Sequence, residues 1–154
     1  MDNKDLTKFI VEAKKNGYAS FGEMGEVSLS DGGKQIKFYK DNFIYTDTYY
    51  GFNPFIGTEV VLFDNKPVWA MSYHGKLING DSEKIYNFLK KVLQKVSVTS
   101  PFRGPRNHGE GSLEYINEFE GDFSDFKGRE KILSDDVLAY ELEYFGGRVR
   151  RKVV

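Results

Sequence analysis

The sequence predicts an α+β fold, a single domain in which a twisted, mainly antiparallel sheet of about six to eight strands packs against two helices. The chain has 154 residues, enough for one domain with a substantial hydrophobic core. Several segments rich in aromatic and β-branched residues are separated by turn residues, which is typical of strands. Two other segments place apolar residues at the helical period.

The first predicted helix covers residues 4–16, and Gly17 is its expected stop. Its apolar stripe consists of Leu6, Phe9, Ile10 and Ala13. Residues 18–33 contain several glycines that interrupt any period, so they are predicted to form a loop with one short strand near residues 26–29.

Residues 34–39 and 43–50 predict a hairpin with a turn at Lys40-Asp41-Asn42. In the second strand, alternation places Tyr45, Asp47 and Tyr49 on one face. Asp47 is therefore either held by neighbouring tyrosine hydroxyls or exposed to solvent.

The next hairpin is predicted between residues 55–63 and 68–75. A tip at Asn65-Lys66 places Glu59 opposite Ser72, with His74 on the same face as Glu59. Both faces are apolar near the tip, which predicts a central hairpin covered on both sides. Glu59 then lies on an apolar face, where a carboxylate needs a partner or a raised pKa.

The second helix is predicted to follow Asp81 or Ser82 as its N-cap, and the apolar residues from Ile85 to Val96 fit its period. Residues 97–111 are expected to be irregular. They include Arg103, whose guanidinium suits a carboxylate or phosphate. The remaining predicted elements are strands over residues 112–119, 125–133 and 137–145, followed by a basic tail over residues 148–154.

Composition excludes several functional classes. The net charge is −1, with 22 basic and 23 acidic residues, so nucleic-acid binding by this chain alone and binding to anionic membranes are not expected. The absence of cysteine excludes disulfides and thiolate chemistry. No targeting signal or membrane-spanning apolar run is present, and we expect a cytoplasmic protein.

Most catalytic and cofactor motifs are missing. The sequence contains no phosphate-binding loop, no zinc-protease motif and no nucleophile elbow, and its two histidines cannot form a multi-histidine metal centre. The acidic group Glu118, Glu120, Asp122 and Asp125 does not have calcium-loop spacing. No metal site and no cofactor are expected, and acid–base chemistry by carboxylate, tyrosine or histidine remains open.

A series of short motifs runs through nearly the whole chain. They are Phe9-Ile10-Val11-Glu12-Ala13, Asp47-Thr48-Tyr49-Tyr50-Gly51, Phe55-Ile56-Gly57, Pro67-Val68-Trp69, Met71-Ser72-Tyr73-His74-Gly75, Phe102-Arg103-Gly104-Pro105, Phe126-Lys127-Gly128-Arg129-Glu130 and Tyr144-Phe145-Gly146-Gly147. Taken together, the series resembles an uncharacterised bacterial domain family of unknown function. Members occur alone or C-terminal to helix-turn-helix domains of predicted transcriptional regulators. The resemblance implies no assigned activity, and this chain lacks the DNA-binding domain.

The leading functional hypothesis is a small-molecule-binding or sensory domain with an aromatic-lined cleft. Its expected ligand-binding residues are Asp47, Tyr49, Glu59, Trp69, Tyr73 and Arg103. One alternative is an enzyme that uses Glu59 or Asp47 as general base with His74 or a tyrosine as partner. The other is a protein-interaction module that uses sheet edges and exposed aromatics, with a homodimer as one form.

Overall fold

The computed structural model describes residues 1–19 and 25–153. They form one antiparallel sheet of nine strands and two helices, α1 (Asn3–Ala19) and α2 (Ser82–Leu93). The strands are β1 (Glu26–Ser28), β2 (Lys34–Lys40), β3 (Phe43–Gly51), β4 (Phe55–Phe63), β5 (Lys66–Leu77), β6 (Asn107–Glu110), β7 (Leu113–Asp122), β8 (Asp125–Ser134) and β9 (Val137–Arg148).

The sheet consists of two meanders joined at their last strands. The strand order is β1-β2-β3-β4-β5-β9-β8-β7-β6. Each half of the chain therefore begins with a helix and continues with strands that pair in sequence, and the two halves meet where β5 pairs with β9. The single sheet and the two helices agree with the predicted architecture. The sheet is larger than the predicted six to eight strands.

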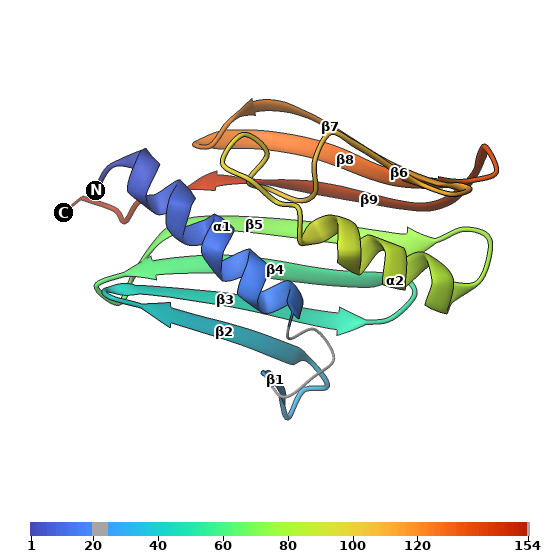
Figure 1. The fold of residues 1–154 in the computed structure, drawn as a ribbon. Coiled ribbons are helices and arrows are strands. Elements are labelled where there is room, and N and C mark those ends of the chain that lie inside the picture. The colour runs from blue at the N-terminus through green and yellow to red at the C-terminus, as the bar shows by residue number, and fades with distance from the viewer. Residues whose placement is uncertain (20–24, 154) are drawn as a thin grey trace.

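Both helices cover the same face of the sheet (Figure 1). The prediction that the β4–β5 hairpin is covered on both sides is therefore wrong. The hairpin is central, but alternate residues such as Thr58 and His74 are exposed on the face away from the helices. Because the residues at those positions are small or polar, this face of the sheet can be exposed to solvent, as in many antiparallel sheets.

Several element boundaries differ from the sequence prediction by a few residues. Among them, strand β9 continues to Arg148, the first residue of the predicted basic tail. Helix α1 continues past Gly17, which is buried against Ile36 and Tyr45. An added Cβ there would make ordinary van der Waals contact with both side chains, so Gly17 is a point where the helix packs on β2 and β3 and is not its stop. Strand β6 lies within the segment that was predicted to be irregular, and it is the short edge strand beside β7. At the N-terminus of α2, the Asp81 side chain accepts hydrogen bonds from Glu83 N and Lys84 N, so Asp81 is the N-cap of the two predicted candidates.

The register of the β4–β5 hairpin is shifted relative to the prediction. Asp64 and Asn65 form the tip with positive φ angles of 49° and 59°. An irregularity at Val61/Leu62 then leaves Glu59 opposite Met71, not Ser72. The asparagine and aspartate tolerate the left-handed conformation that a two-residue turn requires.

The two halves repeat one another in sequence as well as in topology. Several residues of the β4–β5 hairpin recur in the β8–β9 hairpin, always at the same distance along the sequence. The β8–β9 hairpin has the same positive-φ tip, at Asp135 and Asp136, and the same register irregularity, at Ile132/Leu133. The matching residues are Phe55 and Phe126, Gly57 and Gly128, Glu59 and Glu130, Tyr73 and Tyr144, and Gly75 and Gly146.

Candidate ligand-binding pocket

Each half of the sheet buries one glutamate beneath the helices, Glu59 on β4 and Glu130 on β8. Neither side chain is exposed to solvent. Each accepts a hydrogen bond from a tyrosine on the preceding strand: Tyr45 donates to Glu59 at 2.5 Å, and Tyr115 donates to Glu130 at 2.7 Å. The repeat therefore places the same carboxylate and hydroxyl pair twice in one core, where a buried charge needs such partners.

The Glu130 carboxylate is fully engaged. Arg103 donates to both oxygens, at 3.0 Å from Nε and 2.8 Å from Nη2. Tyr140 adds a bond of 2.8 Å to Oε2, beside the Tyr115 bond to Oε1. Burial is the main cause that raises the pKa of both tyrosines, with the neighbouring Glu130 charge as the second cause. Both hydroxyls therefore keep their protons and act as donors.

Glu59 has fewer partners. The Lys14 ammonium lies 3.2 Å from Oε1, and Tyr45 donates to the same oxygen. Among the described residues, Oε2 has no hydrogen-bond partner. The position of Tyr140, which donates to Glu130 in the second half, is occupied by Trp69 in the first half. Trp69 donates its indole N–H to the Phe123 carbonyl at 3.2 Å and not to Glu59.

Lys14 is a buried cation that joins the two halves. Its ammonium pairs with Glu59 and also donates to the carbonyl of Phe102, in the segment after α2. Burial lowers the pKa of Lys14, and the Glu59 charge opposes that shift. The ion pair therefore ties α1 to the centre of the sheet.

The largest chemical difference between the halves is at Asp47 and its counterpart Asn117. Tyr73 donates to Asp47 Oδ1 at 2.6 Å, and Tyr144 donates to Asn117 Oδ1 at 2.7 Å. The Asn117 amide also donates to the Gly104 carbonyl. Asp47 cannot repeat that bond when ionised. Burial and the Glu59 charge raise the pKa of Asp47 to about 7.

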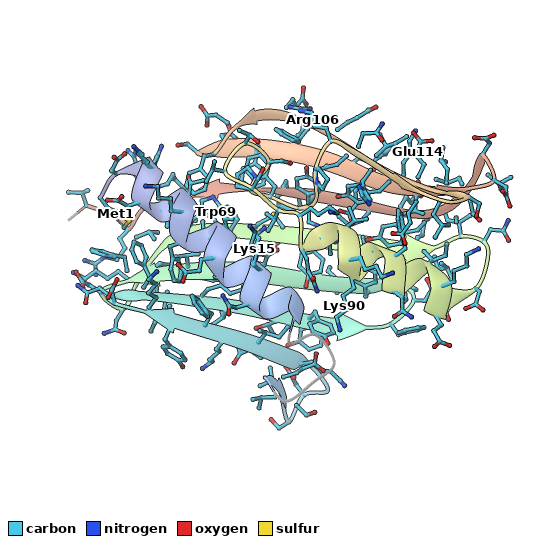
Figure 2. The ribbon with its side chains drawn as sticks, viewed as in Figure 1. Met1, Lys15, Trp69, Lys90, Arg106 and Glu114 are labelled. Carbon is cyan, nitrogen blue, oxygen red and sulfur yellow. The ribbon has the colours of Figure 1, made fainter. Side chains whose placement is uncertain are left out.

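A cavity of about 410 Å³ opens beside Asp47, between α2 and strands β2 to β5. Its wall includes aromatic rings from the sheet and from the helix, together with a few charged side chains. Lys90 lines it from α2, and Figure 2 shows this residue between α2 and the end of α1. The lining residues are Gly32, Lys34, Asp47, Tyr49, Gly51, Phe52, Phe55, Tyr73, Tyr86, Asn87, Leu89, Lys90, Leu93 and Arg103.

Four of the six residues expected to bind a ligand line this cavity, namely Asp47, Tyr49, Tyr73 and Arg103. Glu59 lies on the strand next to Asp47 but is not part of the wall. Trp69 is fully buried. It lies close to α1 (Figure 2), and its ring stacks on Phe123 and Phe126. Trp69 therefore belongs to the core and not to the pocket.

The pairing of Glu59 with His74, which the enzyme hypothesis offered as one option, does not occur. His74 is exposed and lies opposite Ile56 on the face away from the helices. The shifted register explains this, since a shift of one residue moves a side chain to the other face. Asp47 and Tyr73 form the carboxyl and hydroxyl pair at the pocket instead.

The sequence prediction also omitted three residues that shape this site. Lys14 follows Ile10 by one helical turn, so its position on the apolar stripe was a signal that it is buried. Glu130 was quoted only within a family motif, and Asn117 was not singled out. The internal repeat could have found both, because each matches a candidate residue of the first half. Within the described residues, no group of three or more histidine, aspartate or glutamate side chains is placed to hold a metal ion.

Residues 47–149 match a family described as a domain of unknown function, DUF5680. The chain belongs to this family. The DUF5680 region begins at Asp47 and includes Glu59, Arg103 and Glu130, whereas α1 with Lys14 precedes it. No curated protein and no solved structure matches the chain. In the described part of this DUF5680 protein, no helix has the length and apolar character to cross a membrane.

Proposed function

We propose that this domain binds a small organic molecule in the cavity between α2 and the sheet. The observation that carries this proposal is the combination of a cavity of about 410 Å³ with a buried carboxyl group, Asp47, in an otherwise largely aromatic and aliphatic wall. Small-molecule sites have this character, with apolar surface for affinity and a few polar groups for orientation.

The aromatic wall is held in place before any ligand arrives. Tyr86 donates its hydroxyl to the Phe52 carbonyl at 2.8 Å, and its ring meets the Phe52 ring edge-on at 5.0 Å. Phe55 packs against Tyr73 and Tyr86, with ring centroids 6.1 Å apart in both pairs. A preformed wall reduces the entropy that a ligand must lose on binding.

A sensory role is the form of binding that we favour. The wall combines strands of the first half with α2 and Arg103 of the second half, so a ligand would contact both halves at once. The motif series that resembles a bacterial domain found behind helix-turn-helix domains supports the same role, in which ligand occupancy is read out by another domain.

The experiment is a thermal-unfolding screen of a small-molecule library, followed by two matched variants on α2. Lys90→Trp places a large ring at the cavity wall, and Lys84→Trp makes the same exchange at an exposed residue that does not line the cavity. A genuine pocket ligand raises Tm of the unmodified protein and of Lys84→Trp, but not of Lys90→Trp. Equal Tm shifts in both variants contradict binding in this cavity.

An acid–base enzyme is the second candidate, and one observation favours it. Asp47 lines the cavity with its pKa raised to about 7 by burial and by Glu59, the range in which a carboxyl group both donates and accepts protons at neutral pH. Tyr73, within hydrogen-bond distance of Asp47, is its partner. An enzyme should convert its bound ligand chemically. In Asp47→Asn this turnover should be lost while ligand binding persists, and that result would distinguish an enzyme from a binding domain.

A further inference from the structure

We propose that the pocket takes an organic cation, a protonated amine or amidine on a flat apolar or aromatic body, whose N–H groups donate to the Asp47 carboxylate. This inference rests on the proposed function and names the chemical class of its ligand. Three features of the described residues carry it: the balance of buried charges, the comparison of the two halves, and the rings around Asp47.

The buried charges of the described residues do not balance. Three carboxyl groups are buried, Asp47, Glu59 and Glu130, but the buried cations are only Lys14 and Arg103. Lys14 pairs with Glu59, and Arg103 pairs with Glu130. Asp47 is therefore the carboxyl group without an ion-pair partner of its own, and it is the one of the three that lines the cavity. A buried carboxylate is stable only with a counter-charge.

In the second half, Asn117 occupies the position equivalent to Asp47, and the chain itself supplies its hydrogen-bond partners. There the Gly104 carbonyl accepts from the Asn117 amide at 2.9 Å, and the Gly104 N–H donates to the Tyr115 hydroxyl at 3.0 Å. The first half has Asp47 in place of Asn117. Asp47 is only 6% exposed, and within the described part of the chain its Oδ2 has no hydrogen bond. An ionised Oδ2 accepts hydrogen bonds and does not donate them. A ligand group that pairs with it must therefore be a hydrogen-bond donor.

The surroundings of Asp47 suit a cation with an apolar body. The rings of Tyr49, Phe55, Tyr73 and Tyr86 lie in the wall, and aromatic faces attract cations. The chain already uses such contacts, with Arg103 5.4 Å from the centre of the Tyr73 ring and Lys14 5.6 Å from that of Trp69. Two of the three cations of the wall have carboxylate partners: Arg103 is engaged by Glu130, and Lys34 lies 3.3 Å from Glu26. The third cation of the wall is Lys90.

The test uses three probes of one shape and different charge: 2-phenylethylamine, 2-phenylethanol and 3-phenylpropionate. Thermal unfolding and calorimetry at pH 7.5 should show binding of the amine and at least tenfold weaker binding of the alcohol and the acid. Amine affinity should rise with pH through the titration of Asp47, by up to about tenfold per pH unit below its pKa. The titratable and charged groups that face Asp47 are Lys14 from α1, Glu59 from β4, Tyr73 from β5 and Arg103 from the segment after α2.

Variants assign the effect to Asp47. Asp47→Asn, which copies Asn117, should lose both the preference for the amine and the pH dependence of binding. Asp64→Asn removes a carboxyl group in the β4–β5 turn, outside the cavity, and should change neither. Amine binding that persists unchanged in Asp47→Asn or in Lys90→Trp overturns the inference.

The other outcomes separate the two proposals. If the alcohol or the acid binds more tightly than the amine and this binding is lost in Lys90→Trp, the proposal of a cationic ligand is wrong. The cavity is then still a binding site. If neither the three probes nor any library compound binds in a manner sensitive to Lys90→Trp, both proposals are wrong.

Discussion

Asp47 and Glu59 lie directly opposite each other on β3 and β4, and both side chains are turned into the protein interior. Like charges at opposed positions of an antiparallel pair are unfavourable, and burial increases the effect. The second half has the same pair of positions, but there Asn117 lies opposite Glu130. The first half thus keeps a second carboxyl group at a stability cost that the second half avoids, which agrees with the proposal that Asp47 binds a ligand.

The first prediction concerns Asp47 and pH. Its pKa in the folded protein is raised to about 7, above its value in an unfolded chain, so folding stability is lost as pH rises from about 4 to about 7. Asp47→Asn removes this titration and keeps an acceptor for Tyr73. The variant should therefore gain stability relative to the unmodified protein as pH rises, by roughly 2 to 4 kcal/mol above pH 7. Urea unfolding from pH 4.5 to pH 8 measures the difference, and parallel curves for the two proteins contradict it.

The second prediction compares the two buried glutamates. Glu130→Gln removes the counter-charge of Arg103, a carboxylate that accepts four hydrogen bonds, and should destabilise the fold by about 3 to 5 kcal/mol. Glu59→Gln loses fewer bonds and also relieves repulsion with Asp47, so its cost should be smaller by about 1 kcal/mol. Chemical denaturation of both variants at neutral pH decides the order, and a larger loss for Glu59→Gln would be the opposite of this expectation.

The third prediction concerns the pairing of Lys14 with Glu59, which lie 3.2 Å apart with no exposure of either side chain. Lys14→Met should cost about 3 to 5 kcal/mol, because it leaves a buried carboxylate without its cation. The double variant Lys14→Met/Glu59→Gln should be more stable than the sum of the two single losses predicts, by 1 kcal/mol or more. A double-mutant cycle by urea unfolding measures this coupling energy, and additive losses would show that the two residues act independently.

The fourth prediction concerns Gly57, which lies against the ring of Tyr73 across the β4–β5 pair. An added Cβ would overlap that ring, just as one at Gly128 would overlap Tyr144. Gly57→Ala should therefore destabilise the fold by about 1 to 3 kcal/mol and displace the hydroxyl that donates to Asp47. Gly109→Ala, where the nearest atom to the new Cβ is 3.9 Å away, should stay within about 0.5 kcal/mol. Similar Tm values for the two variants contradict the expectation.

Local patterns in the sequence were sufficient for most of the secondary structure. The apolar stripe of α1, the Asp81 cap of α2 and the alternation in β2 and β3 each depend on neighbouring residues, so propensity and periodicity predict them. Alternation alone also placed Tyr45, Asp47 and Tyr49 on one face. The proposal that Asp47 and Arg103 lie near a common cavity came from residue chemistry, and the structure brings both to its wall.

What required the tertiary structure was the register and the pairing of distant residues. The tip at Asp64-Asn65 and the irregularity at Val61/Leu62 moved His74 to the exposed face, because a side chain changes face with each residue of shift. The sequence by itself determined which residues are apolar and which are ionisable. Only the folded sheet decided that Lys14 pairs with Glu59 and that Arg103 pairs with Glu130, since these contacts join elements far apart in the chain. It also decided that Asp47 lines the cavity without an ion-pair partner among residues 1–19 and 25–153.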